Sequence, residues 1–298
     1  RDKLVTGVQT CALPILNPAS VSPGLFRTLQ TLGVNRISIG VQSFSDSTLA
    51  RVGRRHTAAA ALRAVRLAQD AGFDNTGIDL IAGLPGVSSV EWRETLDRAA
   101  SLGLKHLSVY ALSLEPGSRL AQQVEAGLSL PDEQEQLEAL AQAENLLAQA
   151  GFARYEISNY ALPGYACRHN LGVWRGNDYI GLGPAAASRL GLRRWTNSED
   201  LADYMGALKE NRSPPRKDEM LTEADDAVER AVYALRLSEG LDPLLAAERF
   251  PALRELIDRW DERLARLASQ GVTEQDGRSW RLTARGREVC DAAIRELL

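Results

Sequence analysis

The sequence contains few of the residues that bind metals or form covalent cross-links. Among its 298 residues there are only three cysteines, three histidines and two methionines. The cysteines stand far apart at positions 11, 167 and 290, so no disulfide framework is expected and a reducing cytoplasm fits the sequence. No apolar run approaches the roughly 20 residues that cross a bilayer, so no membrane span is expected.

Strong charge of one sign is also missing. The net charge of −4 gives no general electrostatic basis for binding nucleic acid or an anionic membrane. Hydrophobic residues at 44% and charged residues at 25% are ordinary values for a soluble globular protein. A chain of this length has room for one large domain and a smaller one.

The beginning of the chain differs from the rest. Residue 1 is Arg rather than Met, and Arg1–Leu16 lacks the layout of a secretory signal, because its short apolar run comes late. The segment resembles translated sequencing-adaptor text joined to the broken end of a gene fragment. We therefore interpret residues 1–16 as non-native and leave them out of the predicted fold.

From Asn17 onward, helical stretches end in glycine and extended apolar runs follow. Glycine just past a helix accepts the left-handed conformation that closes the last turn, and the glycines concerned are Gly33, Gly72, Gly103 and Gly151. Their spacing leaves room for a crossover helix between parallel strands. Three helix starts are predicted from capping residues, at Thr57, at Ser88 with Glu91, and at Asp132. The alternation predicts an α/β protein with a parallel sheet or barrel.

Polar side chains follow or interrupt the predicted strands at the end where parallel sheets place their ligands. Gln42 ends the run Arg36–Phe44, and Asp79 lies inside the apolar run Gly77–Ile81. A buried carboxylate needs a partner, which is either a protein donor or a ligand hydroxyl. Arg54 offers a bidentate fork for a carboxylate, or simply belongs to a solvated helix start. Gln42 likewise either binds a ligand or satisfies loop backbone.

Four of these stretches together resemble one family. They are Arg36–Phe44, Gly53–His56, Asp79–Pro85 and Tyr155–Asn159. They are similar to radical S-adenosylmethionine (SAM) proteins related to oxygen-independent coproporphyrinogen III oxidase, and most similar to the HemW-type heme chaperones. The resemblance implies a partial TIM-like (βα) barrel over residues 17–191, without its first strands, that binds SAM beside a [4Fe-4S] cluster. It further implies that Gln42, Arg54 and Asp79 contact SAM, with Arg on the methionine carboxylate and Asp on the ribose hydroxyls.

The chain also departs from that family. The CxxxCxxC loop that holds the cluster is absent, and so is the glycine-rich strand end that contacts SAM. Asn17-Pro18 resembles the Asn-Pro that follows a SAM-binding Glu, but Ile15 occupies the Glu position. We therefore expect the intact parent protein to bind a cluster and this chain to bind none, since thiolates hold such clusters. The same absence predicts that this fragment is inactive.

A second group of residues follows the fourth predicted strand. The stretch Cys167–Trp174 resembles the HNxxYW motif linked to heme binding in the chaperones, with Val173 in the Tyr place. A neutral imidazole at His169 can ligate heme iron, and Trp174 can cover a porphyrin face. Alternatively, His169 is a hydrogen-bonded loop residue. Cys167 and His169 alone cannot close a zinc site. Residues 181–188 resemble a glycine-rich segment of the same family, with Ala187 where many relatives carry His.

The last third of the chain predicts a connector and a small domain. Residues 192–220 are polar and contain Pro214-Pro215, which indicates a connector. From 221 to 298, helices at 223–237 and 253–270 precede a hairpin turn at Asp276-Gly277 and a final helix, an α+β, winged-helix-like order. This part has 12 Arg and no Lys against 16 Asp and Glu, so packing or partner docking is favoured over DNA binding.

Two functions therefore compete. The first is a cytoplasmic heme chaperone that binds SAM, a cluster and heme, and transfers heme to an acceptor protein. The second is a radical enzyme that oxidatively decarboxylates coproporphyrinogen III in porphyrin biosynthesis. His169 and Trp174 favour the chaperone, because we expect the oxidase to lack that motif. A generic TIM-like enzyme leaves the joint pattern of Gln42, Arg54 and Asp79 unexplained.

Overall fold

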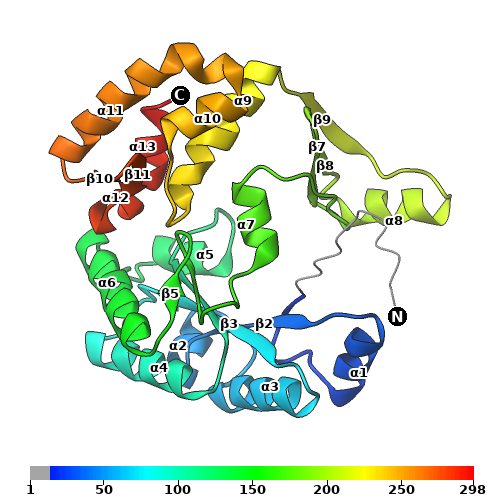
Figure 1. Ribbon diagram of the computed structural model, residues 1–298. Coiled ribbons are helices and arrows are strands. Elements are labelled where there is room, and N and C mark those ends of the chain that lie inside the picture. Colours follow the sequence, from blue (N-terminus) through cyan, green and yellow to red (C-terminus); the bar gives the residue numbers. More distant parts are fainter. Residues whose placement is uncertain (1–13) are drawn as a thin grey trace. The chain divides into compact units, whose positions relative to one another are not determined.

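The computed structural model describes residues 14–298, which fall into two compact units (Figure 1). The first unit ends at Cys167, and the second is Arg168–Leu298. Most of the segment that we interpreted as non-native, residues 1–13 with Cys11, lies outside the described residues. Within the described residues, no helix is long and apolar enough to cross a membrane.

The first unit is built on a six-stranded sheet in the order β1-β2-β3-β4-β6-β5. β1, β2, β3 and β4 run parallel to one another, as the alternation of helices and strands predicted. The strands are β1 (Ile15–Leu16), β2 (Arg36–Gln42), β3 (Asn75–Ala82), β4 (His106–Ala111), β5 (Ala153–Arg154) and β6 (Asn159–Ala161). The helices are α1 (Pro23–Thr31), α2 (Asp46–Arg51), α3 (Ala58–Asp70), α4 (Ser89–Ser101), α5 (Arg119–Glu125) and α6 (Glu133–Gln149).

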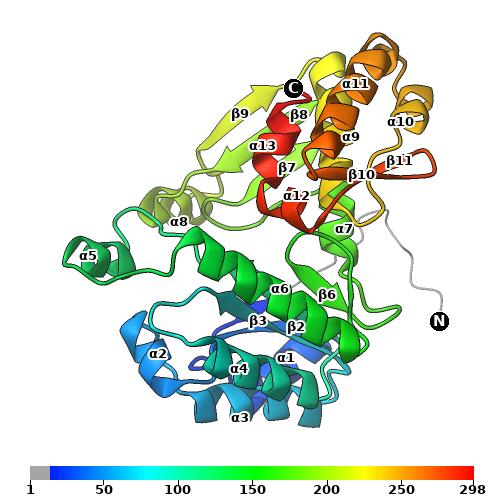
Figure 2. The ribbon, with the colours of Figure 1, turned by 90° about the vertical axis from the view of Figure 1, so that its left-hand side faces the viewer.

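The hydrophobic core lies between the helices and one face of this sheet. Helices α3 and α4 lie along that face in both views (Figure 2). Because side chains alternate along a strand, Ile37, Ile39 and Val41 of β2 enter this core together, with no exposed surface. The helices contribute small residues at helical spacing, such as Ala61 and Ala64, which let α3 approach the sheet closely. The side chains of the alternate strand residues therefore lie on the opposite face of the sheet.

The predicted helix starts are confirmed by their capping bonds. The Thr57 and Ser88 side chains accept hydrogen bonds from the backbone of α3 and α4, and Asp132 forms a reciprocal capping box with Glu135 at α6. Glu91 differs from the expectation. Its carboxylate accepts a 3.0 Å hydrogen bond from Thr48 Oγ1 of α2, which ties α4 to α2.

Two sequence interpretations of this unit were wrong. The run 152–160 is not one parallel strand, because β6 pairs antiparallel with β4 and β5 pairs antiparallel with β6. The connection between β5 and β6 is too short for a crossover helix, so the chain turns back in a hairpin. The end of the excluded segment also belongs to the fold, since Ile15 pairs with Ser38 and Leu16 with Ile39 in parallel.

The second unit contains a three-stranded antiparallel sheet followed by helices and a hairpin. Its strands are β7 (Ala187–Leu190), β8 (Arg193–Asn197), β9 (Arg216–Met220), β10 (Thr273–Asp276) and β11 (Ser279–Leu282). Its α-helices are α7 (Arg168–Trp174), α8 (Leu201–Lys209), α9 (Glu223–Tyr233), α10 (Pro243–Arg249), α11 (Ile257–Ser269), α12 (Ala284–Glu288) and α13 (Cys290–Arg295). The 3₁₀ segments are η1 (Ala234–Arg236) and η2 (Pro251–Leu256).

The stretch 192–220, which we interpreted as a connector, contains two strands and a helix. Cross-strand ion pairs join β8 to β9, with Arg193 Nη2 2.7 Å from Asp218 Oδ1 and Arg194 Nε 2.6 Å from Glu219 Oε2. β9 is exposed along its whole length, so its composition resembles that of a linker. Beyond it, the predicted order of helices, hairpin and final helices is confirmed. The predicted helix 253–270 is η2 followed by α11, and the predicted helix 223–237 is α9 followed by η1.

Candidate functional site

The face of the sheet that does not enter the helical core is polar. On β2, β3 and β4 the register places Gly40 beside Asp79 and Asp79 beside Ser108, so these residues share one face. Ser38 precedes Gly40 by two residues and lies on the same face. A buried sheet face lined by a carboxylate and two hydroxyls is typical of a site that binds polar ligand groups rather than of a packing surface.

Asp79 lies at the centre of this face and is only 7% exposed. Its Oδ1 accepts a 2.8 Å hydrogen bond from Ser38 Oγ, and Ser108 donates a second hydrogen bond to the carboxylate. Burial raises the pKa of Asp79 in spite of these donors and of the nearby positive charge of Arg36. The protein donors that the sequence left open as one alternative are therefore present.

Gln42 ends β2 in an unusual backbone conformation. The register shifts at Val41, since Gly40 pairs with Asp79 but Gln42 pairs with Leu80, so the strand carries a bulge there. Gln42 has a φ of +68°, and Ser43 N donates a 2.9 Å hydrogen bond to Val41 O across it. The Gln42 amide folds back over Gly40, with Nε2 2.9 Å from where a Cβ on Gly40 would lie. The bulge thus turns the amide of Gln42 toward the face that holds Asp79.

Arg54 lies in the loop between α2 and α3, and its side chain is exposed. The loop turns at Gly53, whose φ is +76°, and Arg54 N donates a 2.8 Å hydrogen bond to Leu49 O. Two residues later, the buried His56 donates from Nε2 to Val41 O at 3.0 Å. The structure therefore brings Gln42 and Asp79 to neighbouring strands of one face and fixes the Arg54 loop against the end of β2.

A buried cluster on the same face was missed by the sequence analysis. Arg36 donates from Nη1 to Asn75 Oδ1 at 3.1 Å and to Tyr165 O at 3.0 Å. His106 Nε2 lies 2.8 Å from Tyr155 Oη, and burial, with the charge of Arg36, lowers the pKa of His106 to about 3. The imidazole is neutral at pH 7. The available signal was the alternation of polar residues with apolar ones in β2 and β4.

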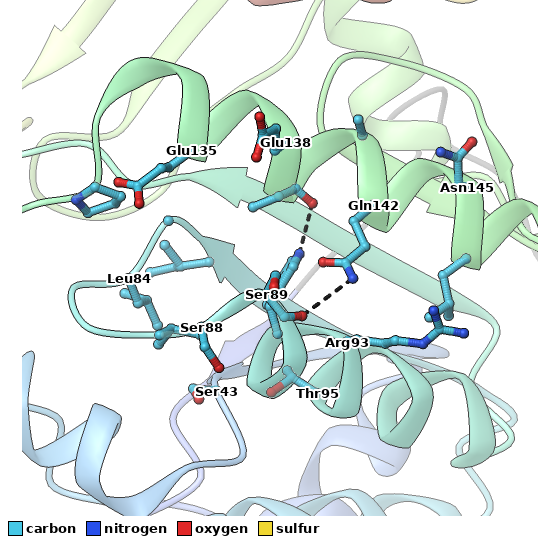
Figure 3. Close-up of a pocket in the computed structure, with 18 of the residues that line it drawn as sticks. Ser43, Leu84, Ser88, Ser89, Arg93, Thr95, Glu135, Glu138, Gln142 and Asn145 are labelled. Carbon is cyan, nitrogen blue, oxygen red and sulfur yellow. Dashed lines mark hydrogen bonds between the residues drawn. The ribbon is translucent and has the colours of Figure 1, made fainter.

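A cavity of about 690 Å³ opens between α4 and α6 (Figure 3). Gln42 and Ser43 line one part of it, whereas Asp79 and Arg54 do not. Two hydrogen bonds cross between the helices, from Trp92 Nε1 to Ala139 O at 2.8 Å and from Gln142 Nε2 to Ser89 O at 3.4 Å. The cavity is therefore a separate feature that touches the candidate site only at the end of β2.

His169 and Trp174 both belong to α7 of the second unit. His169 is exposed and lies edge-on to Tyr179, with ring centroids 6.5 Å apart. Trp174 is partly buried between the Tyr233 ring, at 5.9 Å, and the Arg236 guanidinium, at 4.8 Å. The same short helix thus carries one side chain open to solvent and one side chain that packs within the unit.

The described residues do not fit a four-iron cluster. Among them, no group of three or more His, Cys, Asp or Glu side chains is placed to hold a metal ion. Cys167 and Cys290 are both buried, and the sequence has no three-cysteine loop. Thiolate ligation is the requirement of such clusters, and it is not met by these residues.

The parallel strands with a polar inner face and helices on the outer face define a radical SAM fold. Residues 9–99 match the family model of the Radical SAM superfamily, and residues 221–289 match that of the HemN C-terminal domain. The solved structure of coproporphyrinogen III oxidase (HemN) from Escherichia coli, a radical SAM enzyme, matches with a TM-score of 0.79 at 24% identity. That match covers 96% of this chain and 69% of the oxidase, and it shows the fold alone.

The chain belongs to the HemW family of heme chaperones. It is 36% identical over 302 residues to the heme chaperone HemW of Mycobacterium tuberculosis (strain ATCC 25618 / H37Rv), covering 100% of this chain and 74% of that protein. It is 30% identical over 286 residues to HemW of Bacillus subtilis (strain 168), covering 94% and 75%. HemW of Escherichia coli (strain K12) is 42% identical over 174 residues, covering 58% and 45%. The predicted family is thereby confirmed.

Proposed function

We propose that this chain acts as a heme chaperone, which binds heme and passes it to an acceptor protein in the cytoplasm. The observation that carries the proposal is the exposed imidazole of His169 on α7. A neutral imidazole is a common axial ligand of heme iron. An exposed imidazole releases the iron more readily than one in a closed pocket. Transfer of heme requires both properties.

Trp174 has a supporting part in this proposal. Its ring packs against Tyr233 and beneath the Arg236 guanidinium, which fixes α7 to α9 and η1. Aromatic and cation–π contacts of this kind contribute about 0.5–1.5 kcal/mol each. Trp174 therefore holds the helix that presents His169, in addition to any contact that it makes with a porphyrin.

We further propose that the polar face of the first unit binds SAM through Gln42, Arg54 and Asp79. Ser38 and Ser108 occupy part of the hydrogen-bonding capacity of Asp79, and a carboxylate has about four lone-pair sites, so acceptor capacity remains for ribose hydroxyls. The exposed fork of Arg54 suits the methionine carboxylate. The Gln42 amide, directed over Gly40, supplies neutral donor and acceptor groups between them.

The oxidase alternative has less support than the chaperone proposal. Its support is the likeness to the E. coli oxidase, which at 24% identity concerns the fold. The heme chaperones of M. tuberculosis and B. subtilis, at 36% and 30% identity, align along nearly the whole chain.

Heme titration of the full chain, followed by its visible absorption spectrum, tests the chaperone proposal. Wild type is expected to show an imidazole-ligated spectrum, and His169→Ala to lose it and to bind heme at least about ten-fold more weakly, or about 1.4 kcal/mol. Lys209→Ala, on an exposed residue of α8, is the control and should behave as wild type. An unchanged spectrum and affinity in His169→Ala would remove His169 from the site.

A further inference from the structure

His56 is a buried histidine that lies outside the three proposed SAM contacts. It is 4% exposed and lies in the loop that leads into α3. Its Nε2 is 3.0 Å from Val41 O, and because a carbonyl oxygen only accepts, the imidazole carries its proton on Nε2. Its Nδ1 is buried and has no hydrogen-bond partner among the described residues. The bond to Val41 is therefore the polar contact that orients the ring.

The carbonyl that His56 holds belongs to a strained turn. Val41 O accepts from Ser43 N at 2.9 Å, which closes a three-residue turn around Gln42. A turn of this kind with a positive central φ, here +68°, is rare, and a residue other than glycine in that region costs about 1–3 kcal/mol. Such a conformation persists only where the surroundings hold it. The hydrogen bond from His56 is a contact from outside the strand that does so.

The same imidazole belongs to the loop that presents Arg54. That loop is closed by backbone bonds at its start and by a 2.6 Å hydrogen bond from Ala58 N to Asp46 Oδ1 at its end. Between these two points, the bond from His56 to Val41 attaches the loop to the sheet. One side chain thus joins the turn that directs Gln42 to the loop that carries Arg54.

We infer that His56 is a positioning residue that holds Gln42 and Arg54 in one arrangement, so that the two side chains bind SAM as a unit. The inference rests on the proposed SAM site. It goes beyond that proposal because His56 itself, buried behind the turn, need not touch the ligand. Loss of the hydrogen bond would free the Gln42 turn and the Arg54 loop together.

Two substitutions separate the hydrogen bond from the volume of the ring. His56→Phe fills the space without a donor, and His56→Gln places an amide donor at a similar reach. NMR-detected hydrogen exchange should show the Ser43 and Arg54 amides exchanging at least about ten-fold faster in His56→Phe, about 1.4 kcal/mol. His56→Gln should restore most of the protection, and Arg55→Ala, on an exposed neighbour, should leave it unchanged.

Calorimetric titration with SAM completes the test. His56→Phe should weaken binding at least about ten-fold, and Arg54→Ala should then cost less in that background than in wild type, because the two residues no longer act together. Wild-type exchange rates at Ser43 and Arg54 in His56→Phe would overturn the inference, whether or not SAM binds. SAM binding that Asp79→Asn weakens and His56→Phe leaves intact would also overturn it. Absence of SAM binding by wild type would instead refute the proposed SAM site.

Discussion

Ser38 on β2 donates a 2.8 Å hydrogen bond from Oγ to Oδ1 of Asp79 on β3. The two residues lie on adjacent parallel strands, so the carboxylate is oriented by the sheet itself and not by a mobile loop. A second hydroxyl, Ser108 of β4, completes the arrangement from the other side. Groups held on strands keep their geometry better than groups on loops, which suits a carboxylate that we propose to meet two ribose hydroxyls.

Ser38→Ala is expected to weaken SAM binding without unfolding the protein. A hydrogen bond to a charged group contributes about 1.5–3 kcal/mol, so a loss of about ten-fold in affinity is predicted, measured by calorimetry. Ser101→Ala is the control, because that exposed hydroxyl donates to the Arg98 carbonyl within its own helix, away from Asp79. Equal affinities for Ser38→Ala and wild type would show that the orientation of Asp79 does not matter.

Asp79→Asn should change how stability depends on pH. Burial raises the pKa of Asp79 in the folded state, so the folded protein holds this proton more tightly than the unfolded chain. Wild type therefore loses stability, relative to the variant, as pH rises from about 4, the ordinary pKa of Asp, to the raised value. Above that value the difference stays constant. Urea unfolding across this range measures it, and parallel curves for the two proteins would contradict the prediction.

Gly40→Ala should displace the Gln42 amide and leave the fold intact. A Cβ at position 40 would lie 2.9 Å from Gln42 Nε2, which is the free end of a flexible side chain and can move. We predict a melting temperature close to that of wild type and SAM affinity reduced at least about three-fold. Gly206→Ala, where nothing lies within 4 Å of the added Cβ, is the control. A variant that keeps full affinity would mean that Gln42 need not lie over Gly40.

Asp226→Ala should destabilise the second unit strongly. Asp226 bonds Arg189, which is 6% exposed, and its Oδ2 accepts from Arg230 Nε at 2.8 Å. Removing one partner of a buried ion pair costs about 3–5 kcal/mol when the other charge is left alone. Because Glu229 Oε2 still lies 3.3 Å from Arg189 Nη1, we expect a loss at the lower end of this range. Urea unfolding measures the loss. Glu210→Ala breaks an exposed pair with Arg212 and should cost less than about 1 kcal/mol. Similar losses in both variants would refute this account.

Local signals predicted much of the fold. The capping residues Thr57, Ser88 and Asp132 marked helix starts correctly, because a cap depends on residues three or four apart. The apolar runs that follow helix-ending glycines located β2, β3 and β4, but such runs carry no information about strand direction, and so the hairpin of β5 and β6 was missed. The strands of 192–220, of which β9 is exposed and β8 half-buried, gave no apolar period and were interpreted as a connector.

For the site, position in the chain singled out Gln42 and Asp79, since each stands in or at the end of an apolar run. It did not single out Ser38 or His56. Their roles depend on hydrogen bonds to groups 41 and 15 residues away, which exist only after the strands have paired and the loop has folded against them. Sequence patterns of short range do not contain that information.

The most direct test of the central claim is the SAM dissociation constant of wild type and of Gln42→Ala, Arg54→Ala and Asp79→Asn, measured by calorimetry on the full chain. If these three side chains surround one SAM molecule, each substitution should weaken binding at least about ten-fold, and each variant should still unfold cooperatively. Binding by all three variants with the affinity of wild type would contradict the account.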